Sequence, residues 1–147
     1  EIERIGFTYN SSLNPCFIPG RYMNLGVPRT HFMIGNVHQV PASVSPHLRL
    51  PLFWLSAHNF PFALYLWLCR RTWRHDGYFT TYFHPWEFCP LGEKPEWHIP
   101  YIIRRNAGEG MCARLELLID EFKRLGAEFA TYSEFLNRQH LSDKAQK

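Results

Sequence analysis

The segment 76–88, which reads DGYFTTYFHPWEF, holds the side chains of this sequence that are best suited to chemistry. His84 follows a run of aromatic and β-branched residues that predicts a strand over 78–83, and Pro85 fixes the direction in which the chain leaves it. Functional side chains of α/β folds gather at the carboxyl ends of strands. An imidazole there can donate or accept a proton near neutral pH. We therefore predict that His84 is a catalytic acid–base residue.

The neighbours of this histidine are candidate substrate-binding residues, namely Tyr82, Trp86 and Glu87. Trp86 could face a sugar ring, because flat apolar rings suit the faces of sugars. Glu87 could hold the imidazole in one tautomer or bind a hydroxyl group. In the alternative interpretation His84 is a structural histidine and Trp86 fills the core.

Composition limits the classes of protein to which the chain can belong. The 147 residues are 46% hydrophobic and 20% charged, which is typical of one globular domain. The net charge of +3 and the lack of a long Lys/Arg run argue against a nucleic-acid partner. The longest unbroken apolar stretch, 60–69, is too short to span a membrane. Aromatic residues make up 16%, which favours dense ring packing or an aromatic-lined pocket.

Cysteine and histidine spacing gives no metal motif. No two of the four cysteines are spaced as Cys-x-x-Cys, so we expect free and mostly buried thiols. Ligand spacing is also missing from the histidines other than His84, which are His31, His38, His47, His58, His75, His98 and His140. We therefore expect no metal site within this chain.

The predicted elements alternate between strands and helices. Strands are expected over 7–9, 37–41, 78–83 and 128–130, and helices over 61–74, 111–125 and 132–138. Residues 16–29 are predicted as a loop because Pro and Gly punctuate them. Strands separated by helices favour parallel pairing, which predicts an α/β fold.

Several residues predict where helices begin and end. Gly6 ends a helical segment over 1–5, and Gly126 suits the position after the helix 111–125. Asn59 is the expected cap of the helix that begins near Pro61. A capping box opens the last helix at Thr131 and Glu134. Residues 141–147 are polar, and we expect a frayed tail there.

Two motifs resemble those of one enzyme family. Tyr82-Phe83-His84 resembles the final motif of polysaccharide deacetylases, the NodB-homology family of carbohydrate esterases, and 82–87 is similar to its His-Pro-Trp-Glu variant. Residues 6–12 resemble the family's Gly-aromatic-x-Tyr-Asp-Ser-Ser stretch, with Asn10 in place of the Asp. Residues 37–44 and 127–135 resemble its strand before a Pro-rich turn and its closing strand and helix. The resemblance covers most of residues 6–136.

The resemblance implies an α/β fold of a particular type, a partial, distorted (β/α) barrel. It implies hydrolysis of the N-acetyl amide of a sugar, with an N-acetylated glycan as substrate. In that family one Asp and two His hold a divalent metal, usually zinc, a second Asp acts as base, and a late His protonates the leaving amine. Only the late His carries over to this sequence, and it falls on His84.

The sequence departs from the family in its metal-binding motifs. It contains no Asp-Asp pair, and no two histidines lie four residues apart. We therefore expect residues 1–140 to be the C-terminal portion of a deacetylase domain that is inactive alone, with the metal held elsewhere. The alternative is a non-catalytic glycan-binding or interaction module, which the aromatic loops favour. Neither the oligomeric state nor the cellular location follows from the sequence, which leaves the cytoplasm and the cell envelope both open.

Overall fold

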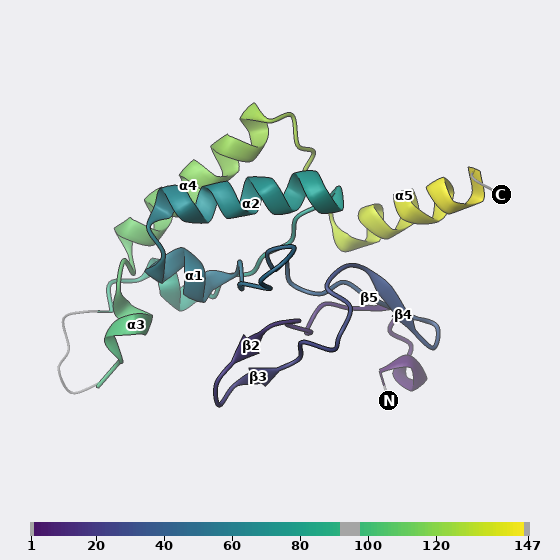
Figure 1. Ribbon diagram of the computed structural model, residues 1–147, viewed down its shortest axis with the longest axis horizontal. Coiled ribbons are helices and arrows are strands. Elements are labelled where there is room, and N and C mark those ends of the chain that lie inside the picture. Colours follow the sequence, from purple (N-terminus) through teal and green to yellow (C-terminus); the bar gives the residue numbers. More distant parts are fainter. Residues whose placement is uncertain (1, 92–97, 146–147) are drawn as a thin grey trace.

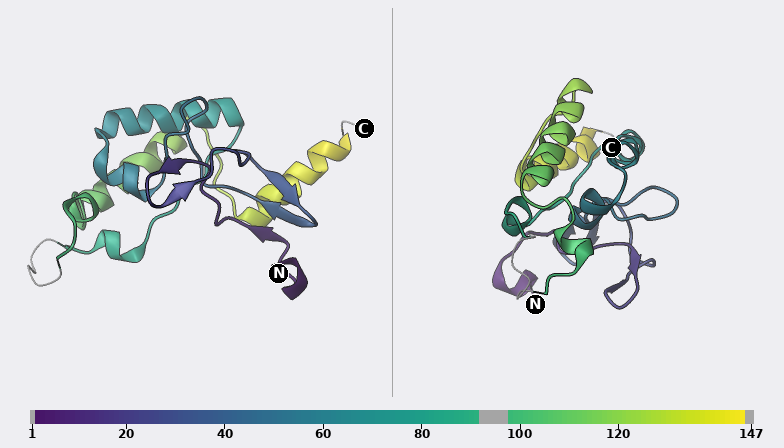
Figure 2. Two further views of the ribbon diagram at one scale, coloured as in Figure 1. Left: turned by 60° about the horizontal axis from the view of Figure 1, so that its bottom comes forward. Right: turned by 90° about the vertical axis from the view of Figure 1, so that its left-hand side faces the viewer.

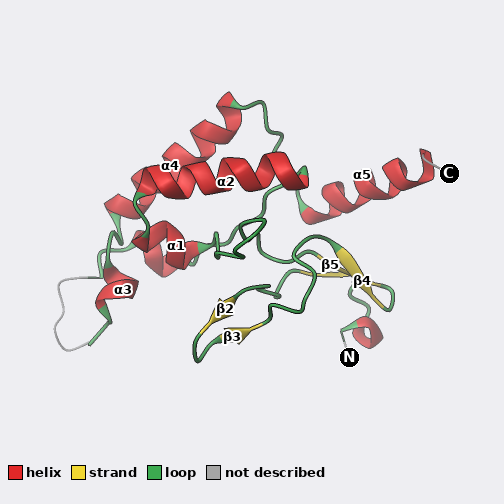
Figure 3. Cartoon of the chain, in the orientation of Figure 1, coloured by secondary structure: helices red, strands yellow, loops and turns green. Residues whose placement is uncertain are grey.

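The computed structural model describes residues 2–91 and 98–145, and places the main helices on one side of the molecule and the short strands on the other (Figures 1 and 3). The elements in chain order are a 3₁₀ turn Glu3–Ile5, β1 Tyr9–Asn10, β2 Phe17–Ile18, β3 Tyr22–Met23, β4 Phe32–Ile34, β5 Val37–Gln39, α1 Trp54–Asn59, α2 Phe62–Asp76, a second 3₁₀ turn Pro85–Phe88, α3 Tyr101–Arg104, α4 Glu109–Arg124 and α5 Tyr132–Ala145. Helix α5 extends away from the other helices toward the C-terminus (Figures 1 and 2).

The strands form two small sheets. One sheet has the order β1-β5-β4, with β1 parallel to β5 and β4 antiparallel to it, and β2 and β3 form an antiparallel hairpin. The expected parallel pairing is therefore confirmed for β1 and β5 alone among the described strands. The sequence predicted neither the hairpin nor β4; their turns use Gly20 and Gly35, which have φ angles of 72° and 58°. Neither sheet closes on itself in the described part of the chain, and the partial barrel stays a prediction.

The two long central helices are confirmed with small shifts at their ends. Gly77 ends α2 at a φ of 76°, and its N–H donates to the carbonyl oxygen of Trp73 at 2.9 Å. After α4, Gly126 has a φ of 77° and donates to Lys123 at 2.9 Å. The cap predicted at Asn59 is wrong, because this residue ends the short helix α1.

The last helix begins as predicted and ends later. The N–H of Thr131 donates to Glu134 Oε2 at 2.7 Å, and the N–H of Glu134 donates back to the Thr131 hydroxyl at 3.3 Å, which confirms the capping box. The backbone of α5 is helical to Ala145, residues 146–147 lie outside the described residues, and the frayed tail over 141–147 stays a prediction. The strand predicted over 128–130 is not formed, because no neighbouring strand pairs with it.

The segment 78–83 is not a strand of either sheet, which corrects the prediction. The N–H of Ser43 donates to the Thr80 carbonyl at 2.9 Å, and the N–H of Trp54 donates to the Tyr82 carbonyl at 3.2 Å. A continuous ladder cannot form here, because the partner changes between these two bonds from a loop residue to the first residue of α1. The two bonds nevertheless fix the direction of the chain as it reaches His84.

Apolar side chains bury two clusters. The larger lies between α2 and α4 and consists of Leu52, Ala57, Tyr65, Leu68, Cys69, Met111, Leu118 and Phe122. The smaller lies beneath the segment that carries His84 and consists of Cys16, Ala42, Val44, Phe53 and Trp54. No helix among the described residues is long and apolar enough to cross a membrane.

All four thiols are free. Cys16 and Cys69 are buried, whereas Cys89 and Cys112 are exposed, so half of the thiols are buried and not most of them. Burial raises the pKa of both buried thiols, and the rise is larger for Cys69. These two thiols are therefore structural, packed as small apolar groups.

Candidate functional site

The local sequence His-Pro-Trp-Glu folds so that Glu87 accepts two hydrogen bonds from His84. The main-chain N–H of His84 lies 2.6 Å from Glu87 Oε1, and its ring Nδ1 lies 2.7 Å from the same oxygen. Pro85 occupies the first position of the 3₁₀ turn, where a missing N–H costs no hydrogen bond. Because an ionised carboxylate only accepts, this contact places a proton on Nδ1. No residue in the described ranges bonds to Nε2 of His84, whose side chain is 38% exposed.

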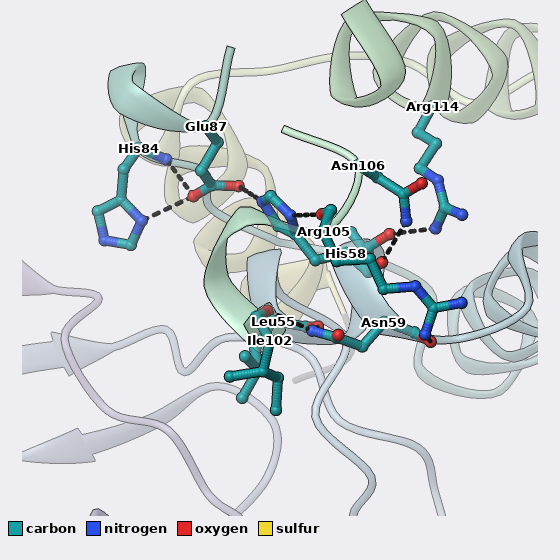
Figure 4. Close-up of polar contacts among 10 residues, drawn as sticks. Leu55, His58, Asn59, His84, Glu87, Ile102, Arg105, Asn106 and Arg114 are labelled. Atoms are coloured by element: carbon teal, nitrogen blue, oxygen red, sulfur yellow. Dashed lines mark hydrogen bonds and ion pairs between the residues drawn. The ribbon is translucent and has the colours of Figure 1, made fainter. Parts of the chain in front are cut away.

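A second histidine lies on the other side of the carboxylate (Figure 4). Oε2 of Glu87 is 3.2 Å from Nε2 of His58, and both side chains are fully buried. Nδ1 of His58 in turn lies 2.5 Å from the carbonyl oxygen of Arg105. The four groups form one chain of polar contacts that leads from the buried end of α1 to the half-exposed ring of His84.

The residues after α3 hold His58 in place by binding the last carbonyls of α1 (Figure 4). The Asn106 side chain donates to the His58 carbonyl at 2.6 Å, and Arg114 donates to the Ala57 carbonyl at 2.5 Å. Burial, and then the neighbouring charge of Arg105, lower the pKa of Arg114. Cations and amide donors at this end of a helix satisfy carbonyls that have no partner within it. The short helix α1 is thus fixed from outside.

Aromatic rings surround the imidazole of His84. Trp86 stacks on it, with ring centroids 5.4 Å apart and planes 17° apart. Trp54 and Tyr82 meet it edge-on, at centroid distances of 5.4 Å and 5.6 Å. The Arg21 guanidinium lies 5.7 Å from the Trp54 ring, at the edge of this group. The three ring contacts fix the plane of the imidazole, and Arg21 adds a cation beside Trp54.

Tyr82 also has ring and hydrogen-bond partners. Its ring stacks on Phe53, with centroids 5.1 Å apart. Burial, followed by a hydrogen bond with Tyr22, raises the pKa of Tyr82, so its hydroxyl stays neutral. The half-buried hydroxyl can therefore serve only as a neutral donor or acceptor toward a ligand.

The structure brings all four predicted residues together. Of the two roles considered for Glu87, holding the imidazole is the one that its geometry supports, because both oxygens are occupied and buried. Trp86 and Tyr82 both contact the His84 ring. Both side chains are half-buried, so only their exposed surface is available to a substrate.

Sequence reasoning missed His58, because its partner Glu87 lies 29 residues away. The signal that could have found it is the position of an ionisable ring inside the apolar stretch 50–69. A polar ring buried there needs hydrogen-bond partners, since an unpaired buried polar group is costly.

The metal site that the resemblance implies has no counterpart in the described residues. Within 2–91 and 98–145, no three His, Cys, Asp or Glu side chains gather closely enough to hold a metal ion. The described residues therefore offer no set of donors for zinc, and we derive no step through a metal.

A cavity of about 890 Å³ lies away from the predicted site. It is bordered by residues 77–81, Phe83, α4 and the start of α5, and none of the four predicted residues lines it. Its lining is largely aromatic and aliphatic and includes Phe79, Phe83 and Phe122. The imidazole of His84 is thus reached from the surface and not from this cavity.

No family model, no curated protein and no solved structure matches this chain. The geometry around His84 and the resemblance of residues 6–12 and 82–87 are therefore the grounds for a function.

Proposed function

We propose that this chain supplies the acid–base histidine of a sugar N-deacetylase, an enzyme that hydrolyses the N-acetyl amide of a glycan. The observation that carries the proposal is the contact of 2.7 Å between Glu87 Oε1 and His84 Nδ1. It holds the proton on Nδ1 and leaves Nε2 of a half-exposed ring to exchange protons with a ligand.

The proposed step protonates the departing nitrogen of the amide. Water adds its oxygen to the acetyl carbon, and the bond between that carbon and the sugar nitrogen breaks. Nε2 of His84, which is bare at the start, takes a proton from the attacking water and passes it to this nitrogen, so that the products are acetic acid, which ionises to acetate, and an amino sugar. Glu87 is a positioning residue here, because a buried carboxylate on Nδ1 fixes the tautomer and stabilises the cationic ring.

The ligand would meet aromatic side chains on reaching His84. Trp86 and Tyr82 are both half-buried, and each contacts the imidazole. Flat apolar rings beside a polar group suit a sugar, which has apolar faces and polar edges. The ligand that this arrangement favours is an N-acetylated glycan.

The test measures acetate release from oligomers of N-acetylglucosamine by the full gene product in the presence of Zn²⁺. His84→Ala is expected to lower turnover by about 10²–10⁴-fold, the usual contribution of a positioned acid–base group. His47→Ala is the matched control, since His47 is exposed and remote from the site. Equal turnover in the His84→Ala variant and the wild type would remove His84 from the mechanism.

A second candidate is a glycan-binding module without catalysis, which the rings around His84 favour. In that case the wild type binds N-acetylated oligosaccharides without releasing acetate. Trp86→Ala would then weaken glycan binding measured by calorimetry. Neither the wild type nor His84→Gln would release acetate.

A further inference from the structure

We propose that His58 is a positioning residue for His84: it holds a proton between itself and Glu87, so that the buried carboxylate stays an anion that fixes the tautomer of the outer ring. The expected effect of His58 on turnover rests on the proposed function. Its effect on protonation follows from the contacts themselves.

The hydrogen-bond pattern assigns the protons one by one. The Arg105 carbonyl can only accept, so Nδ1 of His58 must carry a proton at its 2.5 Å contact. On the far side, Glu87 Oε1 already accepts from the main-chain N–H and the ring Nδ1 of His84. The remaining contact joins Oε2 of Glu87 and Nε2 of His58 at 3.2 Å. Without a proton between them two lone pairs would face each other, so this contact must hold one.

Burial explains why the second histidine is needed. Glu87 and His58 are both fully buried, and an isolated carboxylate in that environment would take up a proton. A protonated Nε2 on His58 gives the pair no net charge, which is the form in which buried ions are tolerated. The anion is then available to Nδ1 of His84.

The surroundings of His58 favour the ring as the place of that proton. Trp86 stacks on it, with ring centroids 6.2 Å apart, and Trp54 meets it edge-on at 5.9 Å. An aromatic face beside a cationic ring is attractive. Arg105 and Arg114 are the cations nearest to this end of α1, but they bind the carbonyls of Asn59 and Ala57 and not the carboxylate. The only carboxylate that faces His58 in the described part of the chain is Glu87.

The protonation is read directly from the wild type by long-range ¹H–¹⁵N correlation spectra of histidine rings above neutral pH. We expect both nitrogens of His58 to be protonated, and His84 to carry its proton on Nδ1 with Nε2 bare. An unprotonated Nε2 on His58, or a proton on Nε2 of a neutral His84, would overturn the proposal without any variant.

A variant then tests whether His58 controls the outer ring. In His58→Phe the carboxylate loses its compensating charge, and the ratio of the Nδ1–H to the Nε2–H tautomer of His84 is expected to fall about tenfold. His58→Gln keeps an N–H donor toward Glu87 and should restore most of the wild-type ratio. His47→Phe makes the same change at an exposed histidine and should leave the ratio unchanged. An unchanged ratio in His58→Phe contradicts the proposal; if this variant does not fold, the wild-type spectrum decides alone.

Kinetics separates this role from the proposed function. In an active enzyme His58→Phe should lower kcat by about 10–100-fold at unchanged KM, as is usual for a group that orients a reacting residue from behind. If the protein shows no deacetylase activity but the tautomers are as expected, the proposed function fails and the positioning role stands. If turnover depends on His84 while His58→Phe changes neither tautomer nor kcat, the positioning role fails and the function stands.

Discussion

Arg29 and Asp76 form a two-point ion pair that joins the loop before β4 to the last residue of α2, 47 positions later in the sequence. Nη1 of Arg29 lies 2.5 Å from Oδ2 of Asp76, and Nη2 contacts Oδ1. Their side chains are 15% and 5% exposed, so the pair is largely shielded from water. Fork-to-fork geometry of this kind is the strongest form of such a contact.

We expect Arg29→Met to lower the free energy of unfolding by about 2–3 kcal/mol, because it removes both guanidinium bonds from a nearly buried carboxylate and leaves it only the exposed ring of His75. Urea denaturation measures the change. Arg71→Met, at an exposed position on α2, is the control and should change stability by less than about 0.5 kcal/mol. Equal losses in the two variants would show that the ion pair contributes no more than a surface arginine.

The hydroxyl of Tyr132 ties the start of α5 to the rest of the molecule. It lies 2.8 Å from the Ser11 hydroxyl and 2.7 Å from that of Thr80. Tyr132→Phe removes both contacts, and we expect a loss of about 1–2 kcal/mol in urea denaturation. Tyr101→Phe is the matched control, because Tyr101 is 64% exposed. A loss no larger than that of the control would mean that packing alone holds α5.

The four thiols should fall into two classes of reactivity. Cys89 and Cys112 are exposed, whereas burial raises the pKa of Cys16 and of Cys69 and keeps them as thiols. A thiol-reactive disulfide reagent at mildly alkaline pH should therefore modify two cysteines quickly and the other two only after unfolding. Rapid modification of all four in the folded protein would contradict the burial of these two side chains.

Acid should weaken the contact between α2 and α4 at Glu121. Hydrogen bonds from Arg124 and Arg70 lower the pKa of this carboxyl from 4.5 to about 2. Because the folded-state pKa is the lower one, the unfolded chain binds a proton first as the pH falls. The stabilisation is therefore complete above pH 4.5 and is lost progressively toward pH 2. The pH dependence of the thermal midpoint should show this fall.

Glu121→Gln is expected to flatten that acid limb, and Glu116→Gln on the same helix is the control, since Glu116 is exposed. If the thermal midpoint falls as steeply with acid in Glu121→Gln as in the wild type, other carboxyls cause the loss of stability.

Local patterns predicted those parts of the structure that need only near neighbours. The periodicity of α4, the glycine that follows α4 and the capping box at Thr131 all act within a few residues, and each is found. The contact between His84 and Glu87 spans three residues and belongs to the same class.

The failures involve partners far away in the sequence. The segment 78–83 has the composition of a strand, but a strand also needs a continuous partner, and its hydrogen bonds go to a loop and to the start of α1. The contact between His58 and Glu87 is invisible to spacing for the same reason, because the fold and not the local sequence joins them.

Helix α1 has six residues, and its last carbonyls are held by donors from Arg105, Asn106 and Arg114. A helix this short has no stability of its own. Under the proposed function, a mutational screen for loss of turnover should consequently also recover substitutions at Arg105, Asn106 and Arg114, because these residues hold the helix that carries His58.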